Sequence, residues 1–150
     1  MKKIICQNRK AAHDYFIDET YEAGIVLLGP EVKSLREGRA NLVDSYARAK
    51  KGEVFLHNMH ITPYSHTHHL ALDPTRTRKL LLNRDEIRRL IGKTEERGYS
   101  LIPLKAYFSG GRVKIEIALA KGKRKVDKRH AIKEKDLRRE IEQARKKEDR

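Results

Sequence analysis

A mainly β protein with flanking helices is the fold class that the sequence predicts: a small antiparallel barrel, closed or partly open, with two or three α-helices and a disordered basic C-terminal tail. Turn signals separate five or six short strand-like segments, a pattern typical of small barrels. The segment at residues 113–119 alternates apolar with polar side chains, as a half-buried strand does. The tail, residues 121–150, holds fourteen Lys and Arg against seven Asp and Glu, without any aromatic residue or Pro.

This composition divides the chain into two parts. The tail cannot bury enough apolar surface to offset the entropy lost when a segment is ordered. Its apolar residues recur at helical spacing as Leu137, Ile141 and Ala144, which makes only a marginal helix in water. We therefore expect residues 1–120 to form the barrel, and residues 121–150 to stay disordered when free and to become helical when docked on a partner.

The first half of the body begins with a predicted strand at residues 15–28, interrupted at Asp18-Glu19 and again at Ala23-Gly24. If it is a strand, the even spacing of Asp14, Asp18 and Glu22 places these acids on one face. A short helix is predicted from Pro30 to Gly38, with Pro early, Glu31 in the first turn and Gly just past the end. Residues 44–51 and 53–58 are predicted to pair as a hairpin that turns at Lys51-Gly52.

The second half holds the clearest helix and the clearest hairpin. Asn83, followed three residues later by Glu86, is a capping-box signal, and Gly98 marks the end of that helix. Residues 101–108 and 113–119 flank Ser109-Gly110-Gly111-Arg112, which predicts a hairpin. The strand pattern stops at Ala120-Lys121-Gly122-Lys123.

Charge points to a polyanionic partner. The formal net charge is +14 and the pI is about 10, a balance that favours nucleic acid. An anionic membrane surface is the alternative, although no apolar run reaches the roughly 20 residues that span a bilayer. The N-terminus lacks the long apolar core of a signal peptide, and the single Cys6, in an end that we expect to fray, excludes an internal disulfide. We expect a soluble, cytoplasmic protein.

The strongest local signal is the run from Asp73 to Asn83. Arg76, Arg78 and Lys79 are suited to phosphate contacts, and the leucines that follow would anchor the segment in the core. The alternative, a solvated loop that leads into a helix, stays open, and the run leaves helix, strand or loop undecided.

The sequence gives little support for a catalytic site or a metal site. Three histidines, His66, His68 and His69, lie close together, but a zinc site needs three or four converging ligands, and a loop does not enforce that. Serine and Cys6 lack the context of a nucleophile, and no Gly-rich phosphate loop is present. We expect no catalytic residue, no metal and no cofactor.

Several segments together resemble one family, the SmpB family, the SsrA-binding proteins of bacteria. The matching runs follow one another along nearly the whole chain: residues 8–10, 13–17, 21–24, 31–36, 40–42, 44–46, 61–63, 73–83, 120–123, 127–129 and 132–134. The most specific are the run at 73–83 and the Asp127-Lys128-Arg129 triplet.

The resemblance implies an antiparallel OB-like barrel that binds the tRNA-like domain of transfer-messenger RNA (SsrA, tmRNA) and delivers it to stalled ribosomes for trans-translation. It ties Glu22, Leu81 and Asn83 to RNA binding, with Glu22 accepting hydrogen bonds from base or ribose donors. We expect Asn8, Arg9 and Lys10, in the first matching run, to contact RNA as well. The body would stand in for the missing anticodon arm.

The resemblance also gives the tail a partner, the ribosome. The tail would become helical in the empty mRNA channel of the small subunit, near the decoding centre. Gly122 matches a hinge-like glycine, and the expected ribosome contacts are Gly122, Lys123, Asp127, Lys128 and Arg129. The elongation factor that delivers tRNA would be an indirect partner.

Two departures from the family pattern bear on these contacts. Val126 stands where a ring-bearing residue is usual before the Asp-Lys-Arg triplet, so a stacking contact there is not carried over. Ala12 stands where a basic residue is common. Two rival hypotheses remain: a structural ribosomal protein, which explains the basic tail equally well, and a metal-dependent RNA-processing enzyme that uses the histidines.

Overall fold

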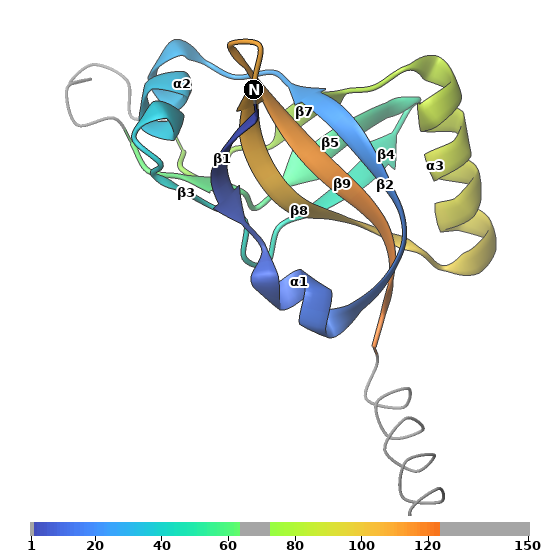
Figure 1. The fold of residues 1–150 in the computed structure, drawn as a ribbon. Coiled ribbons are helices and arrows are strands. Elements are labelled where there is room, and N and C mark those ends of the chain that lie inside the picture. Colours follow the sequence, from blue (N-terminus) through green and yellow to red (C-terminus); the bar gives the residue numbers. More distant parts are fainter. Residues whose placement is uncertain (1, 64–72, 124–150) are drawn as a thin grey trace, which may run out of the picture.

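The computed structural model describes residues 2–63 and 73–123, and in them the predicted mainly β fold with flanking helices is confirmed (Figure 1). The helices are α1 (Arg9–Asp14), α2 (Gly29–Arg36) and α3 (Arg84–Arg97). The strands are β1 (Lys2–Gln7), β2 (Tyr15–Ile25), β3 (Ala40–Asn41), β4 (Tyr46–Lys50), β5 (Glu53–His57), β6 (His60–Ile61), β7 (Arg78–Leu81), β8 (Ser100–Ser109) and β9 (Arg112–Gly122).

The main sheet is an antiparallel ring. Its strand order is β1-β8-β4-β5-β7-β2-β9, and a further pairing of β8 with β9 closes the sheet on itself. The closure between β4 and β8 is narrow, since only Ala47 and Leu101 pair there. Inside the ring lie buried apolar side chains, among them Leu56, Leu80, Ile115 and Ile117. Figure 1 shows the three helices on different sides of this ring.

The predicted turns and caps are in place. Lys51 and Gly52 have φ of 53° and 76°, and Gly110 and Gly111 have 57° and 77°, so both hairpins turn through the left-handed region that tight hairpins require. Helix α3 begins after Asn83, whose backbone N–H donates to Glu86, and ends at Gly98 in a left-handed conformation. Helix α2 ends at Arg36, just before Gly38.

Three predictions about the N-terminal half are wrong in whole or in part. Cys6 lies in β1, which pairs with β8, and is half-buried rather than frayed; burial raises the pKa of its thiol to about 11. Strand β2 has a bulge between Ile17 and Glu19, where one of the two interruptions was predicted, but it pairs regularly at Ala23-Gly24, so the second interruption is wrong. Asp14 belongs to α1, and the bulge changes which face the later residues occupy, so Asp14, Asp18 and Glu22 do not share one.

The end of the barrel also differs from the prediction. Strand β9 does not stop after Leu119 but continues through Gly122, which pairs with Tyr15. The run that begins at Asp73 forms a turn at Pro74-Thr75, which is followed by strand β7. The three clustered histidines and the tail beyond Lys123, with Asp127, Lys128 and Arg129, lie outside the described residues. No helix in the described residues is long and apolar enough to cross a membrane.

Candidate RNA-binding surface

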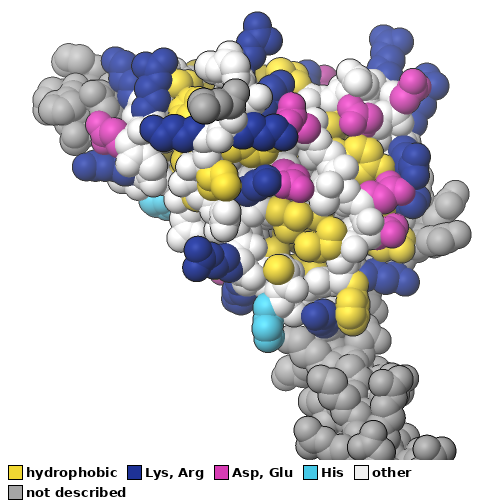
Figure 2. Space-filling view, in the orientation of Figure 1, with side chains coloured by type: hydrophobic (Ala, Val, Ile, Leu, Met, Phe, Trp, Pro, Cys, Tyr) yellow, Lys and Arg dark blue, Asp and Glu magenta, His cyan; other side chains and the backbone are white. Residues whose placement is uncertain are grey.

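The outer face of β1, β8, β9, β2 and β7 gathers predicted site residues from distant parts of the chain. Directly paired residues of antiparallel strands point to the same face. One row across the strands is therefore Ile4, Tyr107, Lys114, Gly24 and Leu81, and the neighbouring row is Lys105, Glu116 and Glu22. In Figure 2, Lys and Arg side chains gather over the part of this face near the N-terminus and the β8–β9 turn.

Leu81 is presented on this face by a close backbone approach. A Cβ on Gly24 would lie 3.2 Å from the Leu81 Cβ, so glycine lets strands β2 and β7 bring Leu81 in this close. The Leu81 side chain nevertheless remains 51% exposed. Beside it opens a hollow of about 490 Å³, whose lining also includes Leu27, Val32, Arg112 and Lys114. An exposed leucine next to cations fits the apolar face of a base or ribose together with its phosphate.

Glu22 lies on the same face and keeps part of its carboxylate open to solvent. The Tyr107 hydroxyl donates to its Oε2 at 2.5 Å, and Lys2 Nζ lies 3.8 Å from the same oxygen. The Tyr107 hydrogen bond is the main cause that lowers the pKa of Glu22, and the charges of Lys2 and Lys114 add to it. Glu22 is therefore an ionised hydrogen-bond acceptor with its side chain 45% exposed.

We name these residues the open face: Glu22 and Leu81, the buried ring of Tyr107, and the cations Lys2, Lys105, Arg112 and Lys114. Asn83 follows Leu81 at the end of β7 and is also exposed. Glu22 and Leu81 thus lie on one face, and Asn83 is an exposed residue two positions after Leu81, while their common role in RNA binding stays a prediction.

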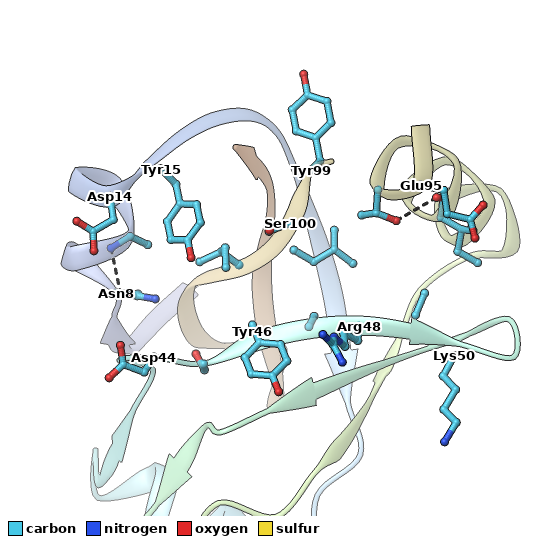
Figure 3. Close-up of a pocket in the computed structure, with 18 of the residues that line it drawn as sticks. Asn8, Asp14, Tyr15, Asp44, Tyr46, Arg48, Lys50, Glu95, Tyr99 and Ser100 are labelled. Carbon is cyan, nitrogen blue, oxygen red and sulfur yellow. Dashed lines mark hydrogen bonds between the residues drawn. The ribbon is translucent and has the colours of Figure 1, made fainter. Parts of the chain in front are cut away.

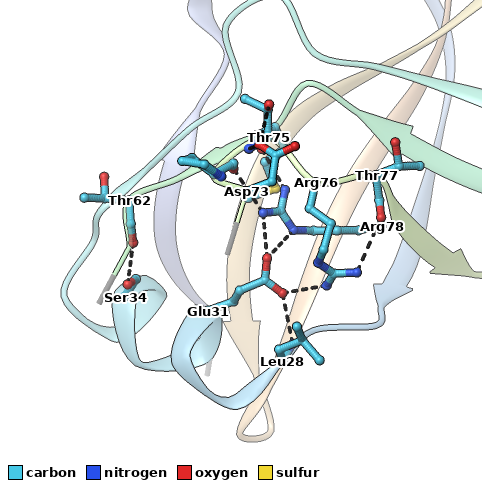
Figure 4. A network of polar contacts seen from close by, with 11 residues as sticks. Leu28, Glu31, Ser34, Thr62, Asp73, Thr75, Arg76, Thr77 and Arg78 are labelled. Atoms are coloured by element: carbon cyan, nitrogen blue, oxygen red, sulfur yellow. Dashed lines mark hydrogen bonds and ion pairs between the residues drawn. The ribbon is translucent and has the colours of Figure 1, made fainter. Parts of the chain in front are cut away.

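Arg78, predicted to contact phosphate, is instead part of a buried ion-pair network with Glu31 and Arg76 (Figure 4), which we name the Glu31 clamp. Arg78 is 0% exposed. Its Nε and Nη2 lie 2.7 and 2.6 Å from Glu31 Oε2, and its Nη1 donates to the Met59 carbonyl at 2.7 Å. A guanidinium without exposed surface cannot touch RNA, so the phosphate contact predicted for Arg78 is wrong for this structure.

The Glu31 clamp joins α2 to the start of β7. Glu31 Oε1 accepts from Arg76 Nη2 at 2.6 Å and from the Leu28 backbone N–H at 2.9 Å, which caps the first turn of α2. Burial alone would raise the pKa of Glu31, but the hydrogen bonds from Arg76, Leu28 and Arg78 outweigh burial and lower it. Arg76 is only partly exposed, whereas Lys79 is more exposed and pairs with Glu53 at 3.0 Å.

Asn8 is likewise structural. It is 7% exposed, caps α1 by accepting from the Ala11 N–H, and donates to the Leu42 and Pro103 carbonyls. The predicted RNA contact at Asn8 is therefore wrong for this structure, because its amide is already used. Arg9 and Lys10 are exposed, and Lys10 Nζ lies 3.6 Å from Asp44.

The structure has a second concave region, which the sequence did not predict. A groove of about 1000 Å³ lies between α1, the end of α3, β4 and β8 (Figure 3). Tyr15, Tyr46 and Tyr99 line it together with Arg48 and Lys50. These residues are far apart in the sequence and carry no common spacing, so only the folded barrel brings them together.

The first residues of the tail, Lys121 and Lys123, lie over aromatic rings. Gly122 is paired in β9, and the Lys123 N–H donates to the Asp14 carbonyl at 2.8 Å. Lys123 Nζ lies 4.8 Å from the Phe16 ring centroid and Lys121 Nζ lies 5.4 Å from that of Tyr99, distances at which a cation is attracted to a ring.

Within residues 2–63 and 73–123, no group of three or more His, Cys, Asp or Glu could hold a metal ion.

The chain is similar to known proteins of one family. The profile of the SmpB protein family matches residues 5–147. An SsrA-binding protein of Syntrophobacter fumaroxidans is 63% identical over 144 residues, which cover 96% of this chain and 89% of that protein. An SsrA-binding protein of Geobacillus thermodenitrificans is 61% identical over 142 residues, which cover 95% of this chain and 92% of that protein.

A solved structure agrees with these relatives. It is described as "tmRNA-SmpB: a journey to the center of the bacterial ribosome", and its matching chain is 49% identical, with a TM-score of 0.69. The match covers 85% of this chain and 93% of that chain. Because the family profile spans almost the whole sequence and both relatives and fold agree with it, the chain belongs to the SmpB family.

Proposed function

We propose that this protein binds the tRNA-like domain of transfer-messenger RNA and delivers that RNA to stalled ribosomes. The observation that carries the proposal is the open face, in a chain that belongs to the SmpB family. There an ionised acceptor, Glu22, lies near an exposed Leu81, and cations surround both. Acceptor, apolar contact and cations match the base or ribose donors, the ring faces and the phosphates of a folded RNA.

The phosphate contacts follow from exposure. With Arg78 in the core, we assign them to the exposed or half-exposed cations of the open face, Lys2, Lys105, Arg112 and Lys114. Arg76 contributes less because the buried Glu31 carboxylate holds it. Lys79 is paired with the partly exposed Glu53, as Lys105 is with Glu116, and stays a candidate. We expect no step in which the protein makes or breaks a covalent bond.

The tail would have a separate role on the ribosome. In this proposal the barrel takes the place of the anticodon arm, and the basic tail enters the empty mRNA channel near the decoding centre, with Lys123, Asp127, Lys128 and Arg129 among its contacts. The elongation factor that delivers tRNA would meet the protein only through the RNA. The charge of the tail supports this role, since fourteen cations in thirty residues suit a channel lined by RNA phosphates.

A cut after Lys123 tests this division of roles, because β9 already ends at Gly122. We expect the shortened chain to bind the tRNA-like domain within about threefold of the full chain at physiological salt, since the open face is retained. Tagging of stalled nascent chains in a reconstituted translation system should be lost. Loss of RNA binding on truncation would contradict the proposal, and a protein that stays on ribosomes regardless of stalling would favour a structural ribosomal role.

A further inference from the structure

The contact between Tyr107 and Glu22 reaches across a strand. Tyr107 lies on β8 and Glu22 on β2, with β9 between them, where Lys114 is paired with Tyr107 and Glu116 with Glu22. The Tyr107 hydroxyl passes over β9 and donates to Glu22 Oε2 at 2.5 Å. Although Tyr107 points to the outer face, it is only 2% exposed.

Two lysines cover the Tyr107 ring. Lys2 Nζ lies 5.2 Å from the ring centroid and Lys105 Nζ lies 5.7 Å from it. Lys105 is held in turn by Glu116 at 3.2 Å. The ring is therefore fixed by its surroundings, and its hydroxyl has a defined direction.

This arrangement occupies one oxygen of Glu22 and leaves the other available. Both Tyr107 and Lys2 approach Oε2. Among residues 2–63 and 73–123, no hydrogen bond reaches Oε1. A carboxylate that is held at one oxygen presents the second in a fixed direction.

Strand β2 also carries a second Tyr–Glu pair, Tyr21 and Glu19, in which both carboxylate oxygens accept hydrogen bonds. Tyr21 donates to Glu19 Oε2 at 2.5 Å, but Glu19 Oε1 accepts from Arg89 at 2.6 Å and from Lys93 at 3.3 Å, both on α3. Both oxygens of Glu19 thus accept hydrogen bonds within the fold. The two Tyr–Glu pairs share their chemistry and differ in the oxygen left for a ligand.

We propose that Tyr107 is a positioning residue: it orients the Glu22 carboxylate so that Oε1 accepts a hydrogen bond from a base amino or imino group or a ribose 2′-hydroxyl of the bound RNA. This inference rests on the proposed function. The ligand group is an uncharged donor because a carboxylate repels phosphate, whereas it accepts well from amino groups and from the 2′-hydroxyl.

The charged groups around Glu22 explain why one hydroxyl is decisive. The groups that face it are Lys2 from β1, Tyr107 and Lys105 from β8, and Lys114 and Glu116 from β9. Without the Tyr107 hydroxyl, the Glu22 carboxylate loses the hydrogen bond that fixes its direction. Its pKa then rises toward the ordinary value, since this hydrogen bond is the largest cause of the lowering.

The test is a double-mutant cycle in the full-length chain, with the tRNA-like domain of transfer-messenger RNA as the ligand. We expect Tyr107→Phe to weaken binding about tenfold, since it removes a hydrogen bond to a charged group. In a Glu22→Ala background the same change should have an effect of less than about twofold. The matched control, Tyr21→Phe, should leave affinity within about twofold of wild type.

Each contrary result has a distinct meaning. If Tyr107→Phe weakens binding equally in the Glu22→Ala background, Tyr107 acts through packing and the inference is wrong. If Glu22→Ala weakens binding but Tyr107→Phe does not, the inference fails and the proposed RNA site stands. If Glu22→Ala itself has no effect, the RNA contact at Glu22 and this inference both fail.

A second measurement does not involve RNA. The carboxyl ¹³C shift of Glu22, followed against pH in the free folded protein, should report a higher pKa in Tyr107→Phe than in wild type. The pKa of Glu22 should not change in Tyr21→Phe. An unchanged titration in Tyr107→Phe would overturn the coupling between the two side chains.

Discussion

Glu31 and Glu22 are both carboxylates that face basic side chains, but their surroundings give them opposite roles. Glu31 is buried, and both of its oxygens are taken by Arg76, Arg78 and a backbone N–H. Glu22 is half-exposed, and one of its oxygens is held while no hydrogen bond from residues 2–63 and 73–123 reaches the other. Charge alone does not identify a binding residue; the number of acceptor positions that remain after folding does.

The cations show the same contrast. Arg78 lies in the run that gave the strongest local signal in the sequence, yet its charge is neutralised within the Glu31 clamp. Arg112 and Lys114 lie on β9, whose sequence gave no signal of a binding site, yet they border the hollow beside Leu81. The Glu31 clamp stabilises the fold, and the open face is left to bind.

The largest expected effect is on stability, from removing one partner of the Glu31 clamp. Glu31→Ala leaves the Arg78 guanidinium buried and unpaired, so we expect the free energy of unfolding to fall by about 3–5 kcal/mol. Urea unfolding followed by circular dichroism measures it. The control is Glu37→Ala, an exposed partner of Arg39, which should change stability by less than about 1 kcal/mol. Equal effects of the two changes would contradict the structural role of the Glu31 clamp.

A second prediction concerns pH. The pKa of Glu31 is lower in the folded protein than the ordinary value near 4.3, so below about pH 5 the unfolded chain binds more protons than the folded one. The stability from Glu31 is therefore fully present above the unfolded pKa and is lost as pH falls through the folded pKa. We expect the stability gap between wild type and Glu31→Gln to narrow from about pH 7 to about pH 3. A constant gap would show that the Glu31 clamp does not depend on the ionised carboxylate.

A smaller effect is expected on the salt dependence of RNA binding. Replacing Arg112 and Lys114 by Gln removes two open-face cations, which should lower the slope of log K against log salt by about 1.5. Replacing Lys50 and Lys51, on the β4–β5 hairpin and outside the named open-face cations, is the charge-matched control and should lower it less. If both pairs lower the slope equally, the phosphate contacts are not concentrated on the open face.

The sequence predicted those features that local chemistry determines. The hairpin at Gly110-Gly111 and the Asn83 and Gly98 boundaries of α3 were correct because turn and cap residues act over a few positions. The Glu31 clamp was not foreseen, because Glu31 and Arg78 lie 47 residues apart and nothing in either segment indicates burial.

The candidate site shows the same limit. Glu22 and Leu81 came from family resemblance, and the register of β2 with β7 explains why they share a face. Tyr107 was missed because a tyrosine in an alternating strand gives no sign that its hydroxyl crosses to another strand. Asn8 was misassigned because an amide in a basic run is equally suited to a cap.

The most direct measurement is the affinity of the full-length protein for the tRNA-like domain after Leu81→Ala and Glu22→Ala, each paired with its unfolding free energy. We expect each change to weaken binding about tenfold, because each removes a contact on the open face. We expect stability to stay within about 1 kcal/mol of wild type for Leu81→Ala, because its side chain is already half in solvent. Affinities within about twofold of wild type for both variants would contradict the assignment of RNA binding to the open face.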